Sequence, residues 1–545
     1  MTEVIEQPYA GGLNYAAEDL ATKEGTVPDA ANVHFGLGGR VSARGGSVKT
    51  VFSLAALSDT TTSGRPVYIV EEDNLSIESV THLALTGGNV SRFSFVGGVE
   101  QLQLAALNAM PSSTSEMYRP VAVAFTDSSS PTTRQRFTVF AYGSGVPKYL
   151  PVGSNTVFSV THADFTATTT YPTTCAAYAG RMFYAGVSAE PARLYYSQVA
   201  TVGTLAPVDP LNPLSTDGGT IDLQLVDGGR ILGLKHLYDI LLIFTTRGIY
   251  RLVALSTGTI PFKVTQVSTQ VATSQHAIVQ ADNEIYFVAR SGVHKLSTAL
   301  TYGDIKSEEV TVSIAQAFDS AQDWELKGAF GTFNKSTRQI HFFFQTSFLP
   351  VGAKPNALPP EYTYAQLAAL FTSSQFFPPS VSTCYTLNLR GSSWERHHFP
   401  FYIDYAIARD AGDGNVVVDA YTRKDAHTGV VSNTQLTEHT IFENGVVTDA
   451  GTAIDAYVRT RKWALDAIGA RKARLFLHSY VKTGTPAAAV SFDDAVFTSI
   501  TPALPTGVSR VAAIGSGHIA QVEYSGGAPW ELNAVAPDIK TLGRR

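Results

Sequence analysis

Adjacent acidic residues are the first candidates for chemistry in this sequence, at Asp493-Asp494 and at Glu71-Glu72-Asp73. A glycosidase needs two carboxyl groups on opposite sides of the bond that it cleaves, at a defined separation. Neighbouring residues on a β-strand point to opposite faces, so adjacency in sequence does not create such a pair. We therefore predict that these carboxylates are charges at turns or strand edges.

Two adjacent histidines, His397 and His398, follow the run Trp394-Glu395-Arg396. In a strand their side chains diverge, so the two cannot jointly hold one metal ion. The only cysteines, Cys175 and Cys384, lie far apart, and no Cys/His spacing typical of zinc sites occurs. We predict two small buried cysteines, no disulfide framework and no metal site.

A glycine-rich stretch, Gly36 to Gly46, contains five glycines and two arginines. The pattern GxxxxGK[ST] is absent and no helix is predicted to follow, so we predict turns rather than a phosphate-binding loop. The motifs of serine hydrolases, zinc peptidases and dinucleotide-binding proteins are also absent. The sequence thus predicts no catalytic, cofactor-binding or metal-binding residues, although an enzyme whose site assembles from distant loops would carry no such motif.

Short apolar strands joined by tight turns are the main predicted elements, and any functional site must be built on them. Arg181–Ala185 and Ala192–Tyr196 predict one antiparallel hairpin, and Ile240–Phe244 and Gly248–Leu252 predict another. Similar pairs recur from about residue 119 to residue 450, at irregular spacings of roughly 40–70 residues. Repeats of three or four strands at such spacings are typical of β-propeller blades. The signatures of WD, kelch and sialidase propellers are absent.

The predicted fold class is therefore all-β: an irregular β-propeller with inserted β and loop regions and a C-terminal domain resembling a β-sandwich. The predicted organisation is an N-terminal arm over 1–50, a small β insertion or platform over 51–118, the propeller over 119–450, and a C-terminal β-domain over 451–545. Residues 350–379 interrupt the propeller as a Pro-flanked insertion, in which Leu367, Leu370 and Phe371 share one face of a short helix. This face packs on its own domain or contacts a partner. Leu102 to Met110 fits a short helix or an apolar strand.

Basic residues gather in the first strands of the C-terminal domain. They are Arg459, Arg461, Lys462, Arg471, Lys472 and Arg474. This cluster is either a solvated strand face or an ion-paired contact with an acidic neighbouring surface.

Composition limits the classes of function. The chain has 545 residues, 44% hydrophobic and 16% charged, with a net charge of −6. The negative charge argues against a general nucleic-acid-binding protein. The N-terminus lacks a secretory signal pattern, and no apolar run reaches the roughly 18 residues of a membrane helix, so we expect a soluble protein that is made in a cytoplasm.

The sequence resembles the tail tube nozzle proteins of short-tailed bacteriophages (podoviruses), also called tail tubular protein B or DNA-stabilisation proteins. The similarity depends on the order of short phrases spread over most of the chain. They are Gly11-Gly12-Leu13-Asn14, Pro28 to Val33, Gly39-Arg40, Arg44-Gly45, Tyr178 to Gly186, Arg193 to Ser197, Asp217-Gly218-Gly219, Ile231 to Lys235, Leu241 to Phe244, Gly248-Ile249-Tyr250, Gly391 to Trp394 and Lys472 to Leu475.

This resemblance implies a structural virion protein and not an enzyme. It implies a homohexameric ring at the distal end of the viral tail, below the portal and adaptor (tail tube) rings. The ring would continue the DNA channel, retain the packaged genome until ejection and anchor tail fibres or spikes, with DNA passing through the lumen without sequence-specific binding. Assembly would take place in the host cytoplasm, and no cofactor is implied. The regions 51–118 and 350–379 are candidate attachment loops or a gate.

Six chains would carry six times −6, or −36, and an acidic lumen would let DNA slide without sticking. The alternative is a propeller that binds host glycan or depolymerises a polysaccharide. A cellular scaffold propeller that binds peptides is disfavoured because the usual blade motifs are missing.

Overall fold

The computed structural model describes most of the chain between residues 11 and 541. The described part excludes 16–25, 37–39, 54–67, 73–80, 86–89, 97–98, 107–120, 127–135, 144, 152–155, 161–163, 168, 198–217, 226–227, 256–261, 299–304, 322, 346–381, 402, 404, 411–415, 424–434, 444–445, 447, 450, 461, 465–472, 494, 501–506, 516–518 and 527–529.

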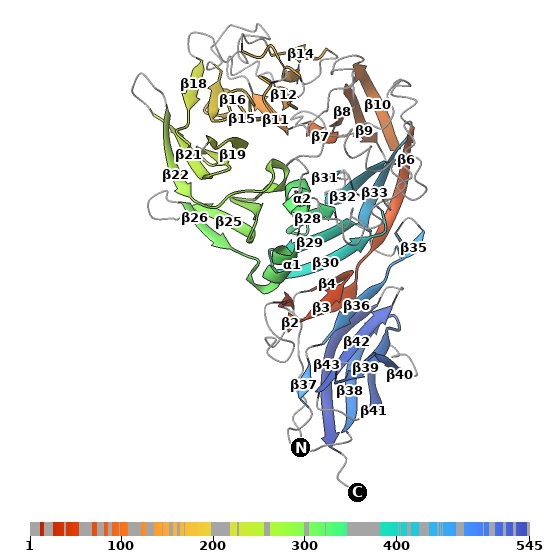
Figure 1. Ribbon diagram of the computed structural model, residues 1–545. Coiled ribbons are helices and arrows are strands. Elements are labelled where there is room, and N and C mark those ends of the chain that lie inside the picture. The colour runs from red at the N-terminus through yellow and green to blue at the C-terminus, as the bar shows by residue number, and fades with distance from the viewer. Residues whose placement is uncertain are drawn as a thin grey trace, which may run out of the picture.

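Four-stranded antiparallel sheets form a β-propeller, arranged around a common centre (Figure 1). Five of these sheets use strands that follow one another in the chain: β7 (Tyr68–Glu72), β8 (Thr81–Leu85), β9 (Val90–Val96) and β10 (Val99–Ala106); β11 (Val121–Thr126), β12 (Arg136–Ala141), β13 (Lys148–Pro151) and β14 (Phe158–Ser159); β15 (Thr174–Tyr178), β16 (Arg181–Ala185), β17 (Arg193–Tyr196) and β18 (Gly219–Asp222); β19 (Ile231–Leu237), β20 (Ile240–Thr245), β21 (Gly248–Ala254) and β22 (Phe262–Ser268); β23 (Ile278–Ala281), β24 (Glu284–Ala289), β25 (Gly292–Thr298) and β26 (Ile305–Glu309). The first strands lie towards the centre, where β15 contacts β11 and β19, and β31 contacts β27 and β7.

Two further propeller sheets take strands from the N-terminal region. One contains β27 (Phe330–Asn334), β28 (Gln339–Gln345), β29 (Ser382–Asn388) and β30 (Ser393–Phe399), extended in parallel by β1 (Gly12–Leu13) and β2 (Thr26–Val27). The other contains β31 (Tyr405–Asp410), β32 (Val416–Arg423) and β33 (Gln435–Glu443), then β6 (Gly46–Ser53), β34 (Thr448–Asp449) and β35 (Thr452–Ala453). Because β6 pairs with β33, an early strand completes the last blade.

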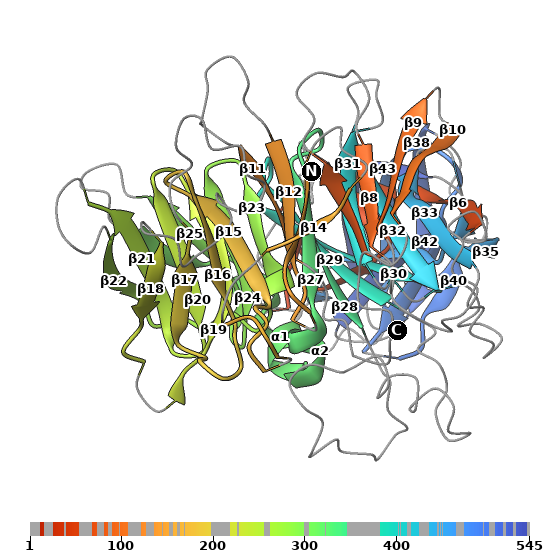
Figure 2. The same cartoon turned by 90° about the horizontal axis from the view of Figure 1, so that it is seen from above.

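The alternating faces of the central strands explain why the sheets stack. Met182 and Tyr184 of β16 pack in a core with β12, whereas Phe183 and Ala185 pack in the next core with β19 and β20. Both faces of such a strand are buried between neighbouring sheets. Every residue of β20 is buried for this reason. Figure 2, seen from above, shows the strands β15 to β25 lying side by side in successive sheets. Continuous apolar runs rather than strict alternation are the expected sequence of strands buried on both faces.

Short helical segments connect some of the sheets. The 3-10 helix η4 (Gln275–Ala277) lies between the fourth and fifth sheets, and the 3-10 helix η5 (Val312–Ile314) and the α-helices α1 (Ala315–Ser320) and α2 (Asp323–Gly328) lie between the fifth and sixth. Gly12, where β1 meets β30, has a φ of +67°, and a Cβ there would lie 2.7 Å from the Trp394 carbonyl oxygen. Only glycine fits this approach without strain. No helix among the described residues is long and apolar enough to cross a membrane.

The C-terminal domain is a two-sheet β structure that includes N-terminal strands. One sheet joins β3 (Asp29–Ala31), β36 (Ala456–Arg459), β42 (Ile519–Gly526), β39 (Ala487–Phe492) and β40 (Thr498–Ile500), and β37 (Trp463–Ala464) pairs with β42. The other joins β4 (Val33–Phe35), β5 (Val41–Ala43), β43 (Glu531–Thr541), β38 (Ala473–Thr483) and β41 (Gly507–Gly515). The predicted propeller with a sandwich-like C-terminal domain is the observed fold.

The N-terminal region differs most from the sequence expectation. Residues 1–50 were expected to form an arm, yet the described residues 12–53 supply β1 to β6 to both the propeller and the C-terminal domain. The stretch 51–118 contributes a four-stranded sheet like the other blades, and Leu102 to Ala106 lie in a strand rather than a helix. The predicted helix in 350–379 lies outside the described residues.

Candidate functional site

The turn between β3 and β4 is the centre of the junction between the propeller and the C-terminal domain. Asn32 occupies this turn with a φ of 57°, a left-handed conformation that asparagine adopts more readily than most residues. Its side-chain amide donates to the carbonyl of Asp455, just before β36, at 2.8 Å. Its side-chain oxygen accepts from the backbone N–H of His398 on β30 at 2.8 Å. Asn32 therefore links the C-terminal domain directly to the propeller.

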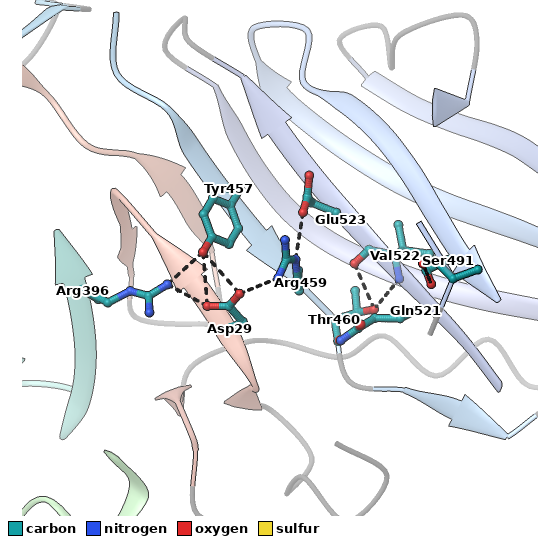
Figure 3. A network of polar contacts seen from close by, with 10 residues as sticks. Asp29, Arg396, Tyr457, Arg459, Thr460, Ser491, Gln521, Val522 and Glu523 are labelled. Carbon is teal, nitrogen blue, oxygen red and sulfur yellow. Dashed lines mark hydrogen bonds and ion pairs between the residues drawn. The ribbon is translucent and has the colours of Figure 1, made fainter. Parts of the chain in front are cut away.

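The carboxylate of Asp29 on β3 makes a second link (Figure 3). Arg396 of the propeller donates from Nη2 to Asp29 Oδ1 at 2.7 Å, and Arg459 of the C-terminal domain donates from Nη1 to Oδ2 at 2.8 Å. The hydroxyl of Tyr457 lies 3.2 Å from Oδ2 and accepts from Arg396 Nη2 at 2.9 Å. Glu523 accepts from Arg459 Nε at 2.8 Å. The two carboxylates and two guanidinium groups cancel in formal charge.

The basic cluster Arg459 to Arg474 was predicted to be either a solvated strand face or an ion-paired contact, and the network answers this question for Arg459. Arg459 is ion-paired, and its acidic partners Asp29 and Glu523 belong to the same chain. Positions 461, 471 and 472 lie outside the described residues. Because β3 pairs with β36 in the register Asp29↔Arg459, the ion pair follows from strand pairing across more than 400 residues of sequence.

Arg44 forms a third connection, inside the protein. Its guanidinium pairs with Asp449 through both terminal nitrogens, and its Nε donates to Asn32 Oδ1 at 3.0 Å. The remaining N–H groups donate to the carbonyls of Gly45 at 3.0 Å and His398 at 2.8 Å. All five donors of the guanidinium are used, which is the condition under which a buried charge is tolerated.

Glu395 is a buried carboxylate beside this turn. Its Oε1 accepts from the backbone N–H of Phe35 at 3.0 Å. Its Oε2 lies 2.8 Å from His34 Nδ1 and 3.3 Å from His397 Nε2. Burial raises the pKa of the Glu395 carboxyl, but the contacts of the carboxylate with the His34 and His397 rings outweigh burial and lower the pKa to about 2.

Aromatic packing closes this histidine cluster on one side. Phe442, at a φ of 65° in the bulged part of β33, places its ring centroid 4.9 Å from that of His397 and 5.6 Å from that of His34. It also stacks on His341 at 5.1 Å. Burial lowers the pKa of both His341 and His397 to about 3, so both rings are neutral at ordinary pH.

The chemistry candidates of the sequence occupy separate places. Asp493 lies in a turn, where its side chain accepts from the Ile519 N–H at 2.9 Å. Positions 73 and 494 lie outside the described residues, and the side chains of 71 and 72 are not described. His397 faces Glu395, whereas His398 Nδ1 lies 3.2 Å from Thr383 Oγ1, so the adjacent histidines diverge as predicted.

The cysteines and the glycine-rich stretch also have definite roles. Cys175 and Cys384 are fully buried, as predicted, in different cores. The glycine-rich stretch includes β5 and, directly after this strand, Arg44, which forms the buried ion pair with Asp449. Sequence reasoning missed Asp29, Asn32 and His34, because their partners lie more than 350 residues away and no local pattern marks them.

Comparisons with known proteins concern the fold alone. No protein-family model and no curated protein matches the chain. The Pan2 WD40 domain of Neurospora crassa is 8% identical, with a TM-score of 0.33, over 73% of this chain and 95% of that one. A chain from the structure of BBS1N in complex with ARL6DN, soaked with lead, is 11% identical, with a TM-score of 0.25, over 50% of this chain and 79% of that one. Neither likeness gives a basis for transferring a function.

Proposed function

We propose that this protein is a structural component of a short-tailed bacteriophage virion, the nozzle at the distal end of the tail. In this role six copies form a ring that continues the DNA channel, retains the genome and anchors fibres or spikes. The ordered resemblance of phrases from Gly11 to Leu475 is the sequence basis of the proposal.

The observation that carries the proposal is the use of one N-terminal segment by both domains. Strands β1 and β6 join propeller sheets, whereas β3, β4 and β5 join the sheets of the C-terminal domain. One apolar core also runs from Leu13 and Trp394 to Val458 and Tyr524. A subunit tied together in this way resists bending between its domains, which suits a part that holds pressurised DNA.

Solution mass and shape test this proposal. We would measure the purified full-length protein by mass photometry and image the same sample in negative stain. A six-fold ring with a central hole is expected, either for the protein alone or after mixing with the portal and adaptor proteins. A monomer that never enters a ring under either condition would rule out the nozzle.

A second assay separates the nozzle from the glycan-active alternative. The same preparation is incubated with host polysaccharide, and the release of reducing sugar and the clearing of turbidity are followed. No release is expected from a structural protein. Sugar release by a monomeric preparation would instead favour a depolymerase.

A further inference from the structure

His34, Glu395 and His397 bring three potential metal-ligand atoms together, all within 4.8 Å of one another. The two residues on β30 are two positions apart, so they share one face of the strand. His34 reaches the same point from β4, which belongs to the C-terminal domain. Glu395 and His397 have fully buried side chains, whereas the His34 side chain is 27% exposed.

We propose that these three residues form a binding site for a divalent transition metal, with Zn²⁺ as the preferred ion. Two imidazoles and one carboxylate are a ligand set that zinc uses, with a fourth position left for water. Magnesium and calcium prefer oxygen ligands, so a site with two nitrogen donors selects against them.

The surroundings of the cluster support this assignment. The Phe35 N–H holds Oε1 of Glu395 at 3.0 Å, which leaves Oε2 directed at the two histidines. Such outer contacts orient a metal-binding carboxylate. The Phe442 ring covers both imidazoles, and the partly exposed edge of His34 leaves a route for an ion.

Charge and hydrogen bonding point the same way. Within the part of the chain that the structure describes, the only hydrogen-bond partner of the His397 ring is Glu395, which lies 3.3 Å from Nε2. No other described group competes for this nitrogen, so it is available as a ligand. A dication would neutralise the buried carboxylate and fix both rings. Because the ligands come from both domains, the bound ion would cross-link the propeller and the C-terminal domain.

Zinc binding by the full-length protein tests the proposal. Protein without an affinity tag is treated with EDTA, exchanged into metal-free buffer and dialysed against Zn²⁺, and bound metal is measured by mass spectrometry. We expect about one zinc per chain at micromolar free zinc, and a rise in melting temperature with Zn²⁺ but not with Mg²⁺. Co²⁺ should give the visible absorption bands of a low-coordinate site.

Two variants localise the binding. His34→Ala should weaken zinc binding at least tenfold and abolish the zinc-dependent rise in melting temperature, because it removes a ligand while the Phe35 contact of Glu395 remains. His294→Ala is the control. His294 lies on β25, in a different sheet from the proposed site, and its ring contacts Ser291. This variant should bind zinc as the unaltered protein does. Less than stoichiometric zinc in the unaltered protein, or equal zinc in the His34→Ala protein, would overturn the proposal. If His34→Ala does not fold, the Co²⁺ spectrum of the unaltered protein decides, and its absence counts against the site. None of these results depends on the nozzle function.

Discussion

Arg44 shows how one side chain can join three parts of a long chain. Its guanidinium is buried, and its partners Asn32, His398 and Asp449 belong to the N-terminal turn, the sixth blade and the seventh sheet. Removing it leaves the Asp449 carboxylate buried without a counter-charge. We therefore expect Arg44→Met to lower the free energy of unfolding by about 3–5 kcal/mol. Urea unfolding followed by tryptophan fluorescence measures this change.

A matched control separates burial from charge. Arg338 pairs with Asp282 at 2.6 Å, but both side chains are about half exposed. Arg338→Met should cost less than about 1 kcal/mol, because water solvates the remaining carboxylate. Equal losses in the two variants would show that burial of the Arg44 pair is not what matters.

The two cysteines give a residue-scale prediction about reactivity. Burial raises the pKa of the Cys175 and Cys384 thiols to about 12. At pH 8 both remain protonated, and the thiolate is the species that reacts. In the native protein we expect both thiols to react with a disulfide reagent at least a hundredfold more slowly than free cysteine. In denaturant two thiols per chain should react rapidly; a fast thiol under native conditions would contradict the buried placement.

At the scale of elements, β3 is the strand on which the junction depends. Asp29 forms ion pairs with Arg396 of the propeller and Arg459 of the C-terminal domain. Asp29→Asn keeps the shape but removes the charge, so both arginines lose an ionic partner. We expect faster amide hydrogen exchange in β3 and β36, with unchanged exchange in the fully buried strand β20. Asp222→Asn, which breaks an exposed pair with Arg193, should leave exchange in β3 and β36 unaltered.

The elements themselves were only partly predictable from the sequence. Apolar runs such as Arg181–Ala185 and Ile240–Phe244 predicted strands correctly, and the second strand extends to Thr245. Strands buried on both faces are made of consecutive apolar residues. The short strands β1 to β5 carry two or three residues each and gain their stability from distant partners. No local preference identifies such strands. The divergence of His397 from His398 was predictable because adjacent residues of one strand point to opposite faces. The contact of the His397 ring with the His34 ring was not, because it depends on strands that are far apart in the sequence.

For the whole molecule, the segment 12–53 should be indispensable. Without it, the last propeller sheet loses β6 and both C-terminal sheets lose edge strands. We expect a protein that lacks residues 1–53 to be insoluble or to melt without a cooperative transition in calorimetry. If the protein without residues 1–53 still melts cooperatively, the segment is not required for folding.

The propeller fold could be predicted from the sequence because its blades are made of hairpins, and the strands of a hairpin are neighbours in the sequence. The partition into an arm, a platform, a propeller and a C-terminal domain describes sequence order. The structure connects positions by pairing instead, as in Asp29↔Arg459 and Ser53↔Gln435. Long-range pairing of this kind leaves no periodic signal, so the interlocked junction and its polar clusters appeared only in three dimensions.

The pairing of β6 with β33 also means that an N-terminal strand is synthesised long before its partner. Strand β6 leaves the ribosome early, yet its partner β33 begins at Gln435, and β43, which pairs with the edge of β5 opposite β4, begins at Glu531. Ribosomes add roughly 5–20 residues per second, so the nascent N-terminal strands wait about 20 seconds to more than a minute for their partners. During this interval their edges are open to pairing with other chains on the same messenger. Production yield should therefore depend on translation speed and on chaperone supply more than the stability of the finished protein suggests.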